Sequence, residues 1–186
     1  MPLPGLIPPF LGGPSAAEGG GEPGSTGWVL AGAGANNADA GDVAWTNPGN
    51  VTASDDARAT ANVASPDTTQ YLHATSFGHA LPAGATVTGV EVRVERHASA
   101  ADRVQDHTVQ LIKGGTRQGD NKADTGTSWP DADATVDYGG STAMWSLALT
   151  KADVEAAGFG VALRGKSSVN AQHRVDAIWT NIHYTT

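Results

Sequence analysis

The alternation of apolar and polar residues predicts a β-strand most clearly between residues 85 and 98. Three valines from Val90 to Val94 alternate there with charged residues, so one face of the strand is expected in a core and the other in solvent. Val87 has the opposite parity, and Gly89 lies between it and the other valines. We therefore expect a β-bulge or a twist at Gly89, which would restore the alternation.

Shorter apolar stretches separated by turn residues raise the expected total to about eight to ten strands. One helix is predicted after Thr150, which would act as N-cap with Asp153 in a capping-box position and Gly158 just past the end. The pattern indicates an all-β fold, an antiparallel jelly-roll β-sandwich with one short helix over residues 28–186. The further candidate strands are residues 28–34, 69–78, 106–115, 122–127, 135–138, 159–168 and 174–186.

Residues 1–27 differ in composition from the rest of the chain. The opening MPLPGLIPPFLGG holds four prolines and three glycines among large apolar residues. Proline removes backbone donors and fixes φ, which excludes a regular helix or a paired strand, and the stretch is too apolar for an ordinary solvated tail. The next residues, 12–27, are rich in Gly, Pro and Ser. We expect an extended N-terminal arm and a flexible linker, with the folded domain beginning near Trp28.

Composition and charge narrow the class of function. The net charge is −8 with only 11 Lys and Arg among 186 residues, so we expect no nucleic-acid partner. Cysteine is absent, which excludes disulfides and thiolate zinc sites. The start lacks a basic region before its apolar part, and no apolar run approaches the length of a membrane span. We therefore expect synthesis in the cytoplasm and no membrane partner.

Two acidic stretches are candidates for chemistry. Asp131, Asp133 and Asp137 alternate with small residues and could bind a structural calcium ion, although the full EF-hand pattern is missing and a solvated loop is the alternative. No other cofactor is expected. The residues 54–56, Ser-Asp-Asp, could be a carboxylate pair for calcium or acid–base work, but we favour hydrogen bonds from these side chains to a local turn.

Catalytic motifs are lacking, and we predict that the protein is not an enzyme. The six histidines are scattered without metal-ligand spacing, and the chain has no Walker loop, Rossmann fingerprint or nucleophile elbow. Among the five tryptophans, Trp145 and Trp179 lie in apolar stretches typical of a core or an interface. Trp129 precedes a proline in a polar stretch and is the candidate for an exposed platform that stacks on a sugar ring.

Several stretches of the chain together resemble a family of jelly-roll domains found in structural proteins of tailed bacteriophages and prophages and in related bacterial surface proteins. The resemblance spans residues 28–186 and is a series of moderately specific pieces. They are WTNPGNVTASDD (45–56), YLHATSFG (71–78), LPAGATVTGVEVRVER (81–96), LTKADV (149–154), GFGVAL (158–163) and RVD (174–176). No catalytic residues are carried over with it.

The resemblance implies a virion structural protein, with a capsid decoration (cement) protein or a head-spike or fibre-base protein as the expected type. The arm would then bind the major capsid protein or another virion protein, and its proline content lowers the entropy cost of ordering. A disordered tail is the alternative for the arm. We further expect a homo-oligomer on a symmetry axis, located on the virion exterior. The alternative function is a carbohydrate-binding module for host adhesion. The expected arm contacts are Leu3, Leu6, Ile7, Phe10 and Leu11.

Overall fold

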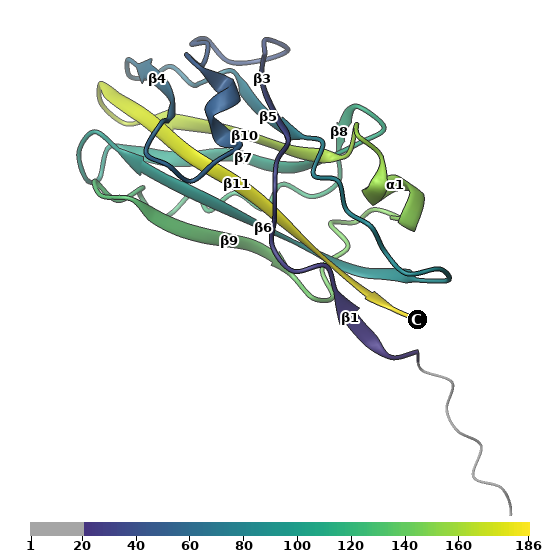
Figure 1. Cartoon of the computed structure of the whole chain (residues 1–186). Coiled ribbons are helices and arrows are strands. Elements are labelled where there is room, and N and C mark those ends of the chain that lie inside the picture. Colours follow the sequence, from purple (N-terminus) through teal and green to yellow (C-terminus); the bar gives the residue numbers. More distant parts are fainter. Residues whose placement is uncertain (1–20) are drawn as a thin grey trace, which may run out of the picture.

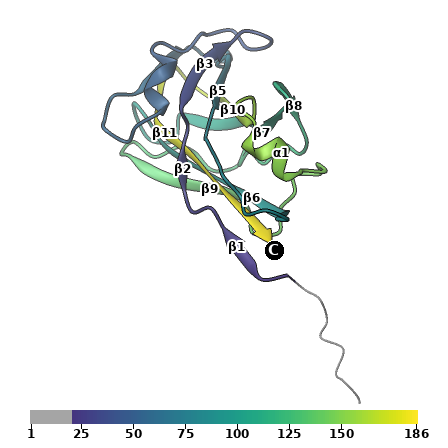
Figure 2. The ribbon, with the colours of Figure 1, turned by 45° about the vertical axis from the view of Figure 1, so that its right-hand side comes forward.

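The chain folds into two antiparallel β-sheets packed face to face, as seen in a computed structural model that describes residues 21–186 (Figures 1 and 2). This confirms the all-β sandwich class expected from the alternating pattern. The finer expectation of a jelly roll stays a prediction. No helix within the described residues is long and apolar enough to cross a membrane.

The first sheet, sheet A, is built around the long strand β11 (Ala171–Thr185). One edge of β11 pairs with β6 (Thr86–Ala98), which in turn pairs with β9 (Ala134–Gly140). The other edge of β11 pairs in succession with three short strands that come early in the chain. These are β4 (Ala59–Val63), β2 (Val29–Leu30) and β1 (Pro23–Ser25).

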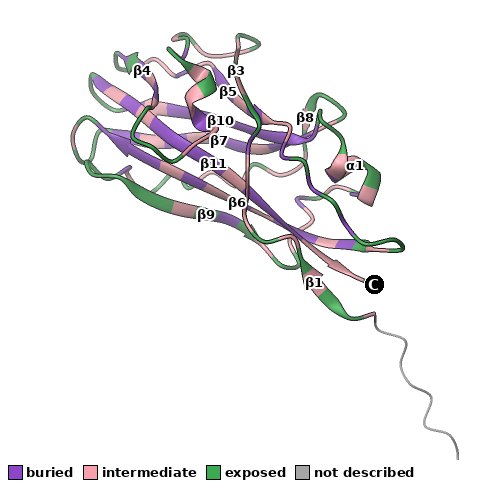
Figure 3. Ribbon diagram, viewed as in Figure 1, coloured by how far each residue is buried: buried purple, intermediate pink, exposed green. Residues whose placement is uncertain are grey.

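The second sheet, sheet B, has the strand order β3–β5–β10–β7–β8. Both sheets turn their apolar residues toward each other, and the buried residues gather along the central strands (Figure 3). The strands of sheet B are β3 (Ala33–Asn37), β5 (Tyr71–Thr75), β7 (Val104–Lys113), β8 (Thr116–Gln118) and β10 (Gly160–Ser167).

Strand β6 confirms the expected alternation and the irregularity near Gly89. The residues Val90, Val92 and Val94 are buried. Gly89 pairs with His183 while Val87 pairs with the next residue of β11, so one residue of β6 is left over and a β-bulge results. A side chain at Gly89 would meet the backbone of Ser141 at 2.4 Å, which explains why glycine stands there.

The expected strand over residues 28–34 is wrong, because the chain changes sheets in the middle of it. Val29 and Leu30 belong to sheet A, whereas Ala33 begins a strand of sheet B. Gly32 lies at the crossing, and a side chain there would meet the Ser76 carbonyl oxygen at 2.5 Å. The apolar run in the sequence is continuous, so it carries no sign of this crossing.

The sandwich also begins earlier in the chain than expected. Part of the predicted flexible linker, residues 23–25, is the strand β1, which pairs with the end of β11. Pro23 is compatible with this strand because β1 is an edge strand, where a missing N–H is tolerated. The residues of β1, Pro-Gly-Ser, pair through their backbone and form no alternating apolar pattern in the sequence.

Residues 122–127 form a loop rather than the expected strand. Side chains replace the strand-to-strand hydrogen bonds there: Asp124 Oδ1 accepts from the N–H groups of Gly126 and Thr127, and Asn121 Oδ1 accepts from the Ala123 N–H.

The predicted helix is confirmed as α1 (Lys151–Glu155), with the reciprocal capping box between Thr150 and Asp153. A short 3₁₀ helix, η1 (Pro48–Val51), precedes β4.

Candidate functional site

Trp129 is not an exposed sugar platform, because it is fully buried in the core. Its backbone N–H pairs with the Val104 carbonyl, and the side chain turns between the sheets. The indole Nε1–H donates to Asp106 Oδ1 at 2.8 Å, and the Arg96 guanidinium lies 4.5 Å from the ring centroid. The polar neighbours of Trp129 correctly indicate a loop, but one large residue of that loop fills the sandwich.

Asp106 is the centre of a buried polar cluster that the sequence analysis missed. Its Oδ2 accepts from the Tyr138 hydroxyl at 2.8 Å and from the Asp124 N–H at 3.1 Å, while Arg96 lies 3.4 Å from Oδ1. Burial raises the pKa of Tyr138, and the Asp106 carboxylate adds to this effect. The cluster joins β6, β7, β9 and the loop before β9, so its role is structural. Asp106 lies among polar residues in the sequence, between a glutamine and a histidine, so nothing in the sequence marked it as buried.

The three calcium candidates do not converge on one point. Asp137 forms a two-pronged ion pair with Arg93, with both contacts at 2.7 Å. Asp133 binds Arg58 and lies 2.5 Å from His97 Nδ1, while Asp131 is exposed. Across residues 21–186 no three His, Cys, Asp or Glu side chains are placed to hold a metal ion. The carboxylates of Asp133 and Asp137 are engaged by cations of the protein itself.

The acidic turn at residues 54–56 is fastened to the outer face of sheet A. Ser54 donates to Glu95 at 2.7 Å, and the Asp56 N–H donates to Asp176 Oδ2 at 3.2 Å. Asp55 accepts from the N–H two residues later, as in a local turn. The geometry agrees with the structural interpretation that the sequence favoured. Asp176 is buried, and this burial raises its pKa, with Glu95 adding to the effect.

A hydrogen-bonded chain of polar side chains runs along the outer face of sheet A. The amide of Gln172 accepts from Arg174 Nε at 2.6 Å, and Arg174 Nη1 lies 3.1 Å from His97 Nε2. Since an arginine can only donate, His97 Nε2 accepts and the ring proton sits on Nδ1, facing Asp133. Burial lowers the pKa of His97, in agreement with a neutral ring. Because both ring nitrogens are engaged by protein side chains, this histidine is not free to act as a base that activates a nucleophile.

A serine and a histidine also meet in the interior. Ser167 Oγ lies 2.8 Å from His173 Nε2, the pairing that nucleophilic catalysis requires. Both residues are buried, however, and His173 Nδ1 has no partner among the described residues, so no carboxylate orients the ring. Burial lowers the pKa of His173 to about 3. The pair therefore packs the core and offers no surface for a substrate.

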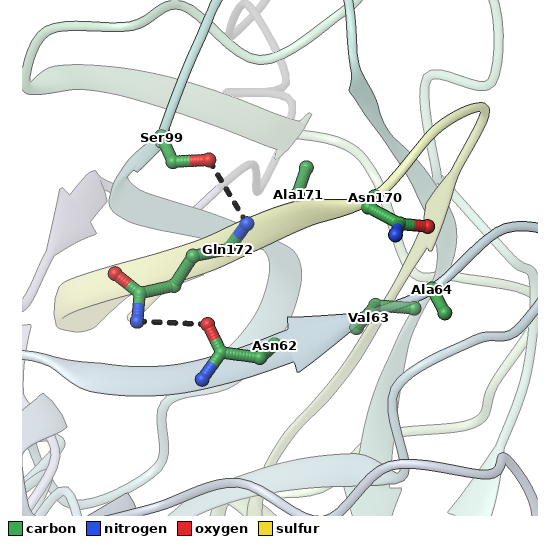
Figure 4. A pocket seen from close by; sticks show the side chains of 7 residues that line it. All are labelled: Asn62, Val63, Ala64, Ser99, Asn170, Ala171 and Gln172. Atoms are coloured by element: carbon green, nitrogen blue, oxygen red, sulfur yellow. Dashed lines mark hydrogen bonds between the residues drawn. The ribbon is translucent and has the colours of Figure 1, made fainter.

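The Gln172 end of the polar chain opens into a groove with a volume of about 470 Å³ (Figure 4). It lies where β4 ends, where β6 ends and where β11 begins. The Gln172 side chain donates to Asn62 Oδ1 and its backbone N–H donates to Ser99 Oγ, each at 3.0 Å. This groove is the candidate functional site of the described residues. It is lined by Asn62, Val63, Ala64, Ser99, Asn170, Ala171 and Gln172.

The expected arm contacts Leu3, Leu6, Ile7, Phe10 and Leu11 lie outside the described residues. The first described residues after this stretch pair with the end of β11. Glu22 and Thr186 exchange two backbone hydrogen bonds of 3.1 Å, and Pro23 pairs with Thr185. We call residues 22–25 the arm root. The root lies beside the end of β11, at the opposite end of that strand from the groove (Figure 1).

Comparisons of the chain with protein-family models, with curated proteins and with solved structures return no match.

Proposed function

We propose that this protein is a non-enzymatic structural protein of a tailed-bacteriophage particle, of the capsid decoration type or a head-spike or fibre-base type. It would bind the particle through its N-terminal arm, and the β-sandwich would project from the exterior. The resemblance of residues 28–186 to phage jelly-roll domains is the reason for proposing a phage structural protein. The arm would be made in the host cytoplasm with the rest of the chain and ordered during assembly.

The arm root is the observation that carries this proposal furthest. The reciprocal hydrogen bonds between Glu22 and Thr186 and the pairing of β1 with β11 tie the start of the sandwich to its longest strand. A force that reaches Glu22 along the chain therefore passes directly into sheet A. The apolar residues from Leu3 to Leu11 would fill pockets on the major capsid protein or another virion protein.

Charge supports an exterior position. The net charge of −8 favours solubility and disfavours contact with packaged nucleic acid. Many copies on one particle would multiply a modest affinity of each arm, which suits a protein that stabilises by bridging neighbouring subunits. The carbohydrate-binding alternative loses the aromatic ring on which it rested, because Trp129 is buried.

Co-sedimentation with phage particles stripped of accessory proteins tests the proposal. The full chain is compared with Leu6→Asp/Phe10→Asp, which places two charges in the apolar stretch. Ala16→Asp/Ala17→Asp adds the same charge outside that stretch and is the matched control. We expect saturable binding by the wild type and the control, and at least a tenfold loss for the arm variant. Failure of the wild type to bind, or equal binding by all three proteins, would overturn the proposal.

A further inference from the structure

The side-chain amide oxygens of the groove already accept hydrogen bonds within the described fold, whereas three of its side-chain donor groups do not donate there. Asn62 Oδ1 accepts from Gln172, and Gln172 Oε1 accepts from Arg174. Asn170 Oδ1 accepts from the Ser65 N–H at 3.3 Å. Within residues 21–186, the amide nitrogens of Asn62 and Asn170 and the Ser99 hydroxyl hydrogen have no acceptor. A ligand that brings acceptors can therefore pair with these three donor groups.

The surroundings of the groove add apolar surface. Val63, Ala64 and Ala171 form part of its lining. Val169 lies beside it in the β10–β11 hairpin and is 46% exposed, the one large apolar side chain exposed among the described residues. The groove thus combines outward amide and hydroxyl donors with an apolar margin. A proline-rich apolar segment fits this combination, because each proline keeps its carbonyl acceptor but lacks an N–H.

The arm of this chain has that chemistry. Its residues 2–10 contain Pro2, Pro4 and the pair Pro8-Pro9, interspersed with large apolar side chains. Four of these nine positions therefore offer an acceptor and no donor. Proline also restricts the free segment, so docking it in an extended form costs less entropy than docking an ordinary peptide.

Distance disfavours docking of the whole segment 2–10 in the groove of the same molecule. Fourteen residues of β11 separate Ala171 at the groove from Thr185 at the arm root, a span of roughly 46 Å at ~3.3 Å per residue. Phe10 is eleven residues from Gly21, so it reaches at most roughly 40 Å from the root. Phe10 therefore cannot reach the groove of its own chain. Leu6, fifteen residues from Gly21, has a reach of roughly 50–54 Å and could touch that groove only in a nearly extended form.

We propose that the groove at Asn62, Ser99 and Asn170 binds the proline-rich residues 2–10 of a second copy of this chain. This inference rests on the proposed function, because it names a partner for the same arm. The arm root and the groove lie at opposite ends of β11, so the contact joins unlike surfaces of the two copies, head to tail. Such contacts close into a ring around an axis when the rotation between copies permits.

Sedimentation velocity of full-length proteins tests the inference. Asn62→Asp/Asn170→Asp keeps each Oδ1 acceptor and its internal hydrogen bond but replaces the outward donors with carboxylate oxygens. Asn37→Asp is a control for such a substitution away from the groove, with one added charge against two. Asn37 Oδ1 likewise accepts internal bonds, from Asp39 and Arg117, on the opposite sheet. We expect concentration-dependent association of the wild type and the control, and an association weakened at least tenfold in the groove variant.

Mixing two defective proteins identifies the contact. The groove variant retains its arm, and Leu6→Asp/Phe10→Asp retains its groove, so an equimolar mixture should form one-to-one pairs that neither protein forms alone. A synthetic peptide of residues 1–13 should dissociate wild-type oligomers, whereas the peptide with its prolines replaced by alanine should not. The peptide result holds even if the groove variant folds poorly.

Two outcomes would overturn the inference. One is a wild type that stays monomeric at all concentrations, and the other is an oligomer that neither the groove substitutions nor the peptide affects. Retained arm-dependent binding to particles in either case would leave the proposed function standing. Loss of arm-dependent particle binding together with intact oligomers would instead overturn the proposed function alone.

Discussion

The Trp129 indole donates its Nε1–H to Asp106 Oδ1 over 2.8 Å inside the sandwich, where neither side chain is accessible to solvent. A buried carboxylate is costly unless cations and donors surround it. Asp106 meets this condition with Trp129, Tyr138, Arg96 and the Asp124 N–H. Each of these groups in turn has the carboxylate as its hydrogen-bond or ion-pair partner. Loss of the carboxylate should therefore leave all of them without that partner at once.

We expect Asp106→Asn to lower the free energy of unfolding by about 3–5 kcal/mol, because the new amide group turns donors toward other donors and leaves Arg96 uncompensated. Urea unfolding followed by tryptophan fluorescence measures this. The control is Asp137→Asn, which also removes a carboxylate paired with an arginine, but at the surface, and should cost less than about 1 kcal/mol. Equal losses for the two variants would contradict the assigned role of Asp106.

Two buried histidines should make the protein less stable in mild acid. Burial lowers the pKa of His79 to about 4 and that of His173 to about 3, against about 6.5 in the unfolded chain. The unfolded state therefore binds more protons below pH 6.5. Stability is complete above that pH and falls as pH drops toward the folded pKa values, by up to about 1.4 kcal/mol per pH unit for each histidine.

Urea unfolding of the wild type and of His173→Gln at pH 7, 6 and 5 checks this dependence. Between pH 6 and pH 5, the free energy of unfolding should fall less steeply with pH in the variant than in the wild type, by the contribution of one histidine. This holds whatever the absolute stability of the variant. His183→Gln is the control, because His183 is only partly buried and pairs with Glu91 on the outer face of sheet A. A slope equal to that of the wild type in His173→Gln would show that the ring is not held neutral.

Gly165 allows His173 to occupy the core. A side-chain carbon at Gly165 would lie 2.3 Å from His173 Nδ1, and β10 shifts its register at this residue. Gly165→Ala should therefore destabilise the fold by about 1–3 kcal/mol through overpacking. Gly140→Ala in β9 meets nothing within 4 Å and is the control. Melting temperatures measured by circular dichroism should separate the two variants by several degrees, and equal values would refute the steric argument.

The capping box of α1 gives a local test. Thr150 accepts from the Asp153 N–H, and the Asp153 carboxylate accepts from the Thr150 N–H and hydroxyl. These hydrogen bonds from Thr150 lower the pKa of Asp153. Thr150→Ala should cost about 1 kcal/mol in chemical unfolding. Thr52→Ala, which removes one exposed hydroxyl contact to the Gly49 carbonyl, should change stability by less than half that amount, and a reversed order would argue against the cap.

The sequence predicted those elements whose determinants are local. The valines of β6, the bulge near Gly89 and the cap at Thr150 each depend on residues a few positions apart, and all three are confirmed. The prediction placed one strand across the change of sheet at Gly32, and it missed the strand β1. Both features depend on contacts with residues far along the chain. Local sequence patterns do not predict such long-range contacts.

The candidate site was harder to predict for the same reason. The groove brings Asn62 and Ser99 to residues 170–172 through the pairing of β4 and β6 with β11, and no motif connects these positions in the sequence. The burial of Trp129 depends on Asp106, which lies 23 positions earlier. Only the proline-rich apolar composition of residues 1–13 stood out in the sequence, and the contacts expected of those residues lie outside the described part of the chain.

The place of β11 in chain order has a consequence for biosynthesis. β11 comes last along the described chain, yet β1, β2 and β4 pair with it alone in sheet A. On the ribosome these three early strands must wait, with open edges, until residues 171–185 have been made and released. Because such long-range pairing folds slowly and exposes strand edges to other chains, the nascent protein has a long interval in which it can aggregate.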